Sequence, residues 1–210
     1  HLNLSGITFL PEEMSVFCTW MCQDSFLTKL VLRGCHGLDT GGSIPFFQAL
    51  GRHKRLRTLN LSNCRLSAKA MVSLVEGVAE NHVLLYLDFS GTSFGDAEAE
   101  AMASSLVRNQ TLRCLRLQNT ALGPDGAEAL SRALLLNRSL HLLDLGSNML
   151  SRACEETPTL QLVMRVIHTV TIVLDDFWVH ADRHRHLLGH NHLQAPPIAS
   201  HSAKPVHTMK

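Results

Sequence analysis

Apolar residues recur along this chain with a nearly constant spacing. One set comprises Leu56, Leu59, Leu61, Cys64 and Leu66. The same pattern returns at 84–94, 112–122 and 140–150, and one slightly longer step backwards reaches a copy at 27–35. A partial copy lies at 2–7. Because apolar residues alternate within each copy, we expect one short strand in each, and six strands in total.

The segments between these strands have helical spacing. Met71, Leu74, Val75 and Val78 follow the order i, i+3, i+4 and i+7, which is typical of a helix with one buried face. Ser67 is a suitable N-terminal boundary for this helix. Asparagine recurs at the return from helix to strand, where we expect the left-handed conformation that ends many helices. These residues are Asn81, Asn109 and Asn137.

The repeat has the form L-x-x-L-x-L-x-x-N/C-x-L, and it resembles the leucine-rich repeat. With one helix in each unit and a period near the upper end of the range for such repeats, it is most similar to the ribonuclease-inhibitor class. That class includes ribonuclease inhibitor, the repeat regions of NOD-like receptors, the GTPase-activating protein of Ran and tropomodulin-like proteins. The resemblance covers about 150 of the 210 residues. It implies a right-handed α/β solenoid, with parallel strands on the concave face and helices on the convex face.

The N/C position of the repeat is expected to support the turn after each strand. A small side chain there tucks under the backbone. The residues at this position are Cys35, Cys64, Thr92, Thr120 and Asn148.

The repeat divides the chain into two regions. Residues 1–151 are expected to form the solenoid. Its first repeat is expected to be incomplete because the sequence opens inside a strand, and its last repeat because the helical pattern does not return after residue 151. Residues 152–210 are expected to form an irregular cap or a poorly ordered, His-rich tail. The tail histidines lack an accompanying cysteine pair or acidic triad, so we expect no metal site. The apolar run 160–174 is too short and too polar to span a membrane.

The charge of the chain limits the class of partner it can bind, and its cysteine content indicates the cellular compartment. The net charge is +1, so we expect no nucleic-acid binding. Six cysteines in a chain of this length do not indicate a disulfide scaffold, and buried free thiols favour a reducing compartment. We therefore expect a cytoplasmic protein. The basic run 52–57 is interpreted first as a solvated loop between helix and strand, with a nuclear-import signal or a contact to an anionic partner as the alternatives.

Side chains alternate along a strand, so the residues between the buried leucines face out of the concave sheet. Aromatic and arginine residues dominate binding hot spots, which makes the only tyrosine, at position 86, a natural centre for a partner. The predicted partner-binding residues are Tyr86, Asp88, Arg116, Gln118, Leu142 and Asp144. In the alternative interpretation, the three charged members pair only with one another along the sheet.

No catalytic motif accompanies the repeat, so we expect a protein-interaction module without enzymatic activity, cofactor or small-molecule substrate. The resemblance favours the repeat region of an intracellular NOD-like receptor or a related scaffold. One alternative is a cytoskeletal or cilium-associated scaffold. Another is a GTPase activator of the Ran type, for which Arg65 and Asn119 lie on the loops after strands.

Overall fold

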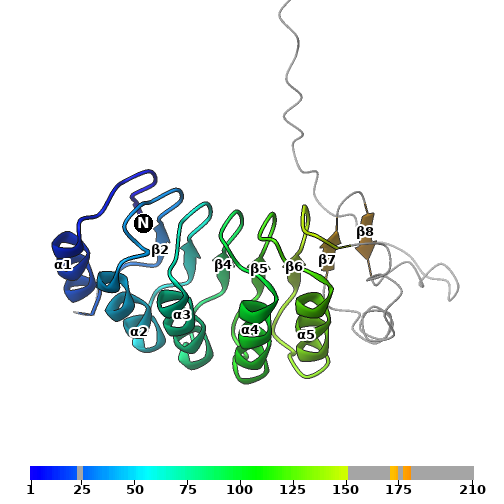
Figure 1. The fold of residues 1–210 in the computed structure, drawn as a ribbon. Helices are drawn as coiled ribbons and strands as arrows, with labels where there is room; N and C mark the ends of the chain where they lie inside the picture. The colour runs from blue at the N-terminus through cyan, green and yellow to red at the C-terminus, as the bar shows by residue number, and fades with distance from the viewer. Residues whose placement is uncertain (23–25, 151–170, 175–176, 181–210) are drawn as a thin grey trace, which may run out of the picture.

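The computed structural model describes residues 1–22, 26–150, 171–174 and 177–180. Short strands and helices alternate along the chain, and all strands belong to one sheet in sequence order (Figure 1). The strands are β1 (Leu2–Asn3), β2 (Lys29–Val31), β3 (Thr58–Asn60), β4 (Tyr86–Asp88), β5 (Cys114–Arg116), β6 (Leu142–Asp144), β7 (Thr171–Leu174) and β8 (Phe177–His180). The helices are α1 (Pro11–Cys22), α2 (Ile44–Arg52), α3 (Ala68–Glu80), α4 (Asp96–Arg108) and α5 (Pro124–Leu134), with a short 3-10 turn at Gly41–Ser43.

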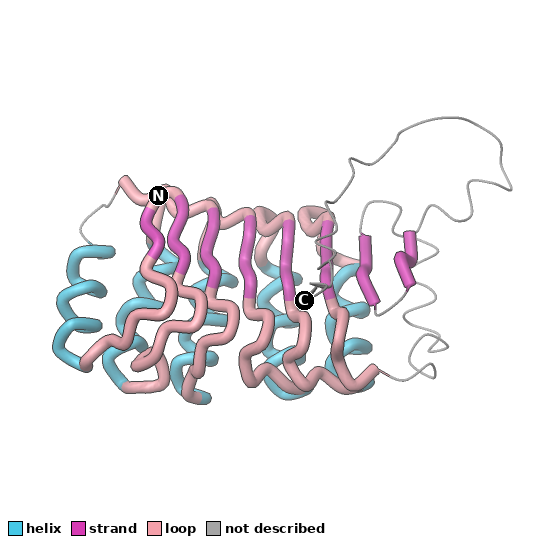
Figure 2. The backbone as a smooth tube through the Cα atoms, turned by 90° about the horizontal axis from the view of Figure 1, so that it is seen from above, coloured by secondary structure: helices cyan, strands magenta, loops and turns pink. Residues whose placement is uncertain are grey.

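The sheet and the helices form two layers, with the strands side by side on one face and the helices on the other (Figure 2). Neighbouring strands from β1 to β7 are parallel. Between β1 and β6, the helix that follows each strand returns the chain to the same edge of the sheet. Tyr86 pairs with Cys114, and Asp88 pairs with Arg116. The register therefore matches the columns of equivalent residues expected from the sequence.

The core consists of leucines stacked from one repeat to the next. Leu59, Leu87, Leu115 and Leu143 are fully buried, one from each central strand. Helices close this core from the other side, as Leu74 in α3 illustrates. Ser67 begins that helix as expected, since its side chain accepts a hydrogen bond from the backbone N–H of Ala70 at 3.2 Å.

The sheet has more strands than the six expected. β7 extends it in parallel with β6, and β8 then pairs antiparallel with β7. Both lie in the segment that the sequence indicated as an irregular cap or tail. Pairing with β7 satisfies the backbone groups that β6 would otherwise leave free at an edge. The rest of 152–210, with the tail histidines after His180, lies outside the described residues.

The asparagines at the helix-to-strand returns do not adopt the expected left-handed conformation. Asn81 and Asn109 are extended, with φ of −78° and −80°. Their side chains instead connect neighbouring repeats: Asn109 Nδ2 donates to the carbonyl oxygens of Val78 and Asn81 at 2.8 and 2.9 Å, and its Oδ1 accepts from the N–H of Leu112 at 2.8 Å. Asparagine is therefore placed here for its hydrogen-bonding capacity and not for its backbone freedom.

Left-handed residues occur instead in the turn after each strand. Six equivalent positions, one in each repeat, have φ between 51° and 75°: Gly6, Gly34, Asn63, Gly91, Asn119 and Ser147. Ala121, two residues after Asn119, is also left-handed, with φ of 64°. Glycine and asparagine adopt this conformation at the lowest cost, which explains five of the six. The N/C side chain next to each turn then binds backbone carbonyls. Cys64 Sγ lies 2.9 Å from the oxygen of Leu32, and Asn148 Nδ2 lies 2.6 Å from the oxygen of Leu117.

The other three N/C residues also donate to backbone oxygens. These contacts are Cys35 Sγ to Leu4 at 2.9 Å, Thr92 Oγ1 to Phe89 at 2.7 Å and Thr120 Oγ1 to Leu117 at 3.0 Å. A thiol, a hydroxyl or an amide group can therefore serve as the hydrogen-bond donor at the N/C position of the repeat.

Candidate functional site

The predicted partner-binding residues lie together on the concave strand face, on β4, β5 and β6 and the turns that follow. Gln118 is exposed, while Tyr86, Arg116 and Leu142 are half-buried. Asp88 and Asp144 are each only 6% exposed, so the expectation that the whole set is solvent-exposed is wrong for these two. Both carboxylates turn back onto neighbouring groups of the sheet and of the following turns, and do not project into solvent.

Asp88 organises the centre of this cluster. Its Oδ2 accepts hydrogen bonds from Asn60 Nδ2 at 3.1 Å and from the Tyr86 hydroxyl at 3.2 Å. Its Oδ1 accepts from the backbone N–H of Ser90 at 3.0 Å. Asp88 therefore holds both the tyrosine and the turn after β4, as a positioning residue. Sequence reasoning missed the role of Asn60, although its place one repeat before Asp88 was a usable signal.

The Arg116 guanidinium lies over the Tyr86 ring, with Cζ 5.6 Å from the ring centroid. This is within the range of a cation–π interaction. Burial, together with the nearby Asp88 carboxylate, raises the pKa of Tyr86 to about 12, so its hydroxyl stays protonated. Burial alone would lower the pKa of Arg116, but Tyr86, Cys114 and the two carboxylates raise it above its ordinary value.

Arg116 is not fully satisfied within this cluster. Among the described residues, its Nε is buried without a hydrogen-bond partner, as is the hydroxyl oxygen of Ser90. The only ion pair within 4.0 Å in that part of the chain joins Arg132 to Glu128 on α5. Arg116 therefore makes no close ion pair with Asp88 or Asp144 among the described residues. In place of the lateral pairing considered as an alternative, the two carboxylates attract the guanidinium only over a longer distance.

Asp144 marks the far side of the cluster. Its pKa is raised, chiefly by burial and also by the charge of Asp88, while Gly146, Gln118 and Arg116 act in the opposite direction. Its Oδ1 accepts from the Gly146 N–H at 3.3 Å. Like Asp88, it supports the turn that follows its own strand.

The cysteine in this cluster is poorly suited to nucleophilic chemistry. Burial raises the pKa of Cys114 to about 11, so the thiolate is scarce at neutral pH. The described residues contain no group of three or more His, Cys, Asp or Glu side chains arranged to hold a metal. Arg65 and Asn119 lie in the turns after β3 and β5, with the β4 repeat between them, so the fold does not bring them together.

No helix in the described part of the chain is both long and apolar enough to cross a membrane.

Comparisons with known proteins agree with this architecture. Two models described as leucine-rich repeats match residues 55–74 and 108–131. The C-terminal domain of Caenorhabditis elegans tropomodulin is 15% identical, with a TM-score of 0.53, over 82% of this chain and 88% of that one. No curated protein matches the sequence.

Two further solved structures are similar over part of their length. The leiomodin-1 actin-binding site 2 structure is 23% identical, with a TM-score of 0.45, over 53% of this chain and 65% of that one. The yeast Rad7–Elc1 complex is 13% identical, with a TM-score of 0.40, over 81% of this chain and 53% of that one. The chain thus spans less than two thirds of the leiomodin-1 structure. The repeat matches and the tropomodulin likeness show that this chain carries leucine-rich repeats in an α/β solenoid, which confirms the expected fold.

Proposed function

We propose that this protein is a non-enzymatic interaction module that binds a protein partner on its concave strand face, with Tyr86 and Arg116 at the energetic centre. The single observation that carries the proposal is the half-buried Arg116, stacked on Tyr86 with an unpartnered Nε. Because Nε itself is buried, a partner's carbonyl or carboxylate accepts from the other guanidinium N–H groups and adds a charge-assisted hydrogen bond to a cation that the cluster leaves incompletely satisfied. Tyrosine and arginine are the residue types most enriched in binding hot spots.

The size of the strand face supports a protein partner over a small ligand. The six repeat strands β1 to β6, about 4.8 Å apart, present a ribbon on the order of 24 Å across. A standard interface uses roughly 20 to 30 residues on each side, so the turns after the strands take part as well. Gln118 and Leu142 extend the contact from Arg116 towards the C-terminal side of the ribbon.

For the cellular context, we propose the repeat region of an intracellular NOD-like receptor or related scaffold, with repeats of the ribonuclease-inhibitor type. The length of the repeat unit and the helix in every unit favour that repeat type. Cys35 and Cys64 are buried free thiols, which is typical of proteins in a reducing compartment such as the cytoplasm.

A cytoskeletal scaffold is a second candidate. The tropomodulin C-terminal domain has the same fold over most of both chains, and tropomodulin-like proteins were among the families that the repeat resembles. This likeness supports the candidate only through the shared architecture, because the identity is low.

The test is a pull-down from cell lysate with the full chain and with a Tyr86→Ala, Arg116→Ala double variant. We expect a partner that the intact chain retains and the variant loses. A Lys69→Ala, Val72→Ala double variant, with one cation and one apolar side chain removed from the exposed face of α3, serves as the matched control. Assaying the three proteins well below the melting temperature of each excludes loss of binding by unfolding.

The outcomes separate the candidates. A partner lost equally from both variants, or from neither, contradicts binding at the strand face. Co-sedimentation with filamentous actin, abolished by the Tyr86 and Arg116 changes alone, would favour the cytoskeletal candidate over the receptor.

A further inference from the structure

The loops that lead from helix to strand form a continuous edge of the solenoid. We call residues 52–57, 80–85, 108–113 and 136–141 the return edge. Backbone hydrogen bonds join these loops one to the next: Leu85 N to Arg57 O at 2.9 Å, Arg113 N to Leu85 O at 2.9 Å, and His141 N to Arg113 O at 2.7 Å. The asparagine side chains add a second row, for example Asn81 Nδ2 to His53 O at 3.2 Å. The backbone of this edge is therefore held in a fixed array, which sets the positions from which its side chains project.

Positive charge is concentrated on the return edge. Of the 13 Lys and Arg residues among residues 1–150, seven lie here, together with only one of the 13 Asp and Glu residues, Glu80. All seven cationic residues are exposed. They are Arg52, Lys54, Arg55, Arg57, Arg108, Arg113 and Arg138. The rest of the solenoid is consequently acidic, so a nearly neutral chain carries a strongly basic edge.

Helix stabilisation does not account for this charge. Cations at the last turn of a helix interact favourably with its dipole, and Arg52 and Arg108 occupy such positions. That effect fades within one turn, whereas Arg57, Arg113 and Arg138 lie in the loops beyond. Among the described residues, the side chains of Arg57 and Arg138 make no hydrogen bond or ion pair.

We propose that the return edge binds an acidic polypeptide segment of a partner protein, lying across the loops from Arg57 towards Arg138. The ladder from Arg57 to His141 spans about 14 Å at the spacing of parallel strands. An extended peptide covers this length with roughly five residues. This surface is separate from the concave strand face, so it does not rest on the function proposed above.

The structure favours an acidic peptide over nucleic acid. Single-stranded nucleic acid is normally held by aromatic side chains on which bases stack, and the return edge contains no Phe, Tyr or Trp. The nearby Phe26 is 82% exposed, but it lies outside the return edge, and the Arg55 guanidinium already stacks on its ring with Cζ 4.6 Å from the centroid. The acidic remainder of the solenoid also opposes a long polyanion. A membrane surface is disfavoured because only Leu85 and Leu136 present exposed large apolar side chains on this edge, 37% and 63% exposed.

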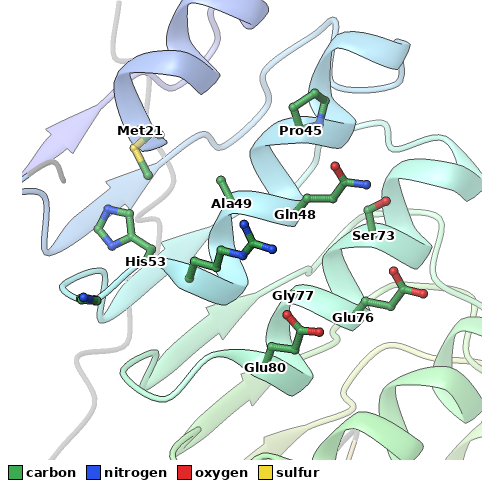
Figure 3. A pocket seen from close by; sticks show the side chains of 11 residues that line it. Met21, Pro45, Gln48, Ala49, His53, Ser73, Glu76, Gly77 and Glu80 are labelled. Carbon is green, nitrogen blue, oxygen red and sulfur yellow. The ribbon is translucent and has the colours of Figure 1, made fainter. Parts of the chain in front are cut away.

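A groove of about 750 Å³ between α2 and α3 limits the site on its convex side. Arg52, His53 and Lys54 line it where it meets the return edge, whereas Glu76 and Glu80 project from α3 on the opposite wall (Figure 3). These two carboxylates repel an acidic ligand, so the segment follows the loops and does not enter the groove.

The test measures binding of the full 210-residue chain to a fluorescein-labelled peptide of about ten alternating Asp and Glu residues, by anisotropy. We expect binding that weakens as salt is raised from about 50 mM to about 500 mM, and no binding of the Asn and Gln analogue. An Arg57→Gln, Arg138→Gln variant should bind about tenfold more weakly. The matched control, Arg65→Gln with Lys69→Gln, removes the same charge at the strand-to-helix side and should change the affinity by less than about twofold.

A second variant tests whether the groove between α2 and α3 limits the peptide-binding site. Glu76→Gln with Glu80→Gln should leave peptide affinity equal or increase it, because repulsion is removed. Weaker binding of that variant, failure of the acidic peptide to bind, or equal losses in the two arginine variants would overturn the proposal. So would tighter binding to oligothymidylate or to phosphatidylserine vesicles than to the peptide. The Tyr86→Ala, Arg116→Ala variant should retain peptide binding, which separates this surface from the strand face.

Discussion

The guanidinium carbon of Arg116 lies 5.6 Å from the centroid of the Tyr86 ring on the neighbouring strand. The Tyr86 hydroxyl in turn donates to Asp88 on the same strand as Tyr86, at 3.2 Å. The cation, the ring and the carboxylate thus form one chain of contacts across the strand face. Their geometry is set by the register of two parallel strands, so it can be tested without knowledge of a partner.

The contact between Arg116 and Tyr86 should contribute measurably to stability. We expect a double-mutant cycle with Tyr86→Leu and Arg116→Met to give a coupling of about 0.5–1 kcal/mol in the free energy of unfolding. Urea unfolding of the four proteins measures it. Tyr86→Phe keeps the ring, so its cycle with Arg116→Met should retain most of the coupling. A value near zero in the leucine cycle would show that the two side chains do not interact in solution.

Asn109 should be essential to the stacking of repeats. Replacing it with Ala removes donors to Val78 and Asn81 and leaves the buried N–H of Leu112 without its partner. We expect a loss of about 2–4 kcal/mol in the free energy of unfolding, measured by urea denaturation. The neighbouring, exposed Gln110 provides the control, because Gln110→Ala should cost less than about 0.5 kcal/mol. Similar losses at both positions would contradict the asparagine ladder.

Alanine variants at Gly91 and Gly34, which occupy equivalent turns, distinguish the cost of backbone strain from the cost of steric overlap. Both are left-handed, with φ of 70° and 64°, so alanine at either should cost about 1 kcal/mol in conformational energy. A Cβ at Gly34 meets no atom within 4 Å, whereas one at Gly91 overlaps with Oδ1 of Asn63. Gly91→Ala should therefore lower the melting temperature more than Gly34→Ala. The reverse order in calorimetry would be inconsistent with the turn geometry described above.

Alkaline pH should destabilise the solenoid through its buried thiols. Burial raises the pKa of Cys64 from 9.0 to about 11. Below pH 9.0 the thiol is protonated in both the folded and the unfolded chain, so it has no effect on the pH dependence of stability. Between pH 9.0 and about 11 the unfolded chain loses this proton first, and the free energy of unfolding falls.

A variant without this thiol provides the measurement for the pH prediction. Cys64→Thr retains a hydrogen-bond donor, as Thr92 and Thr120 do at the same repeat position, but it does not ionise. Urea unfolding across this pH range should show a shallower fall for the variant than for the parent chain. Parallel curves would mean that Cys64 is not the group responsible.

Much of the fold could be predicted because the repeat determines burial locally. A leucine such as Leu115 is inward-facing whenever it alternates with polar neighbours, and the same arrangement recurs one repeat later at Leu143. The period also predicted the pairing of Tyr86 with Cys114, since each unit returns the chain by one strand. β7 and β8 were missed because their sequence does not follow the repeat, and the unpaired edge of β6 decides their place.

The candidate site was predicted in position but not in detail. Alternation placed Asp88 and Asp144 on the outward face, yet both are buried because their neighbours across the sheet and in the following turns enclose them. The asparagine ladder was likewise misread, since the partners of Asn109 lie about one repeat earlier in the chain.

The amino-acid sequence by itself determined the repeat unit, the strand register and the residues that share a column, because these depend on the periodic burial of apolar side chains. Only the tertiary structure decided which outward-facing groups remain accessible and where charge accumulates. The loops of the return edge come together only when the repeats stack, and the burial of Asp88 depends on contacts with Asn60 and Tyr86 that alternation alone does not specify.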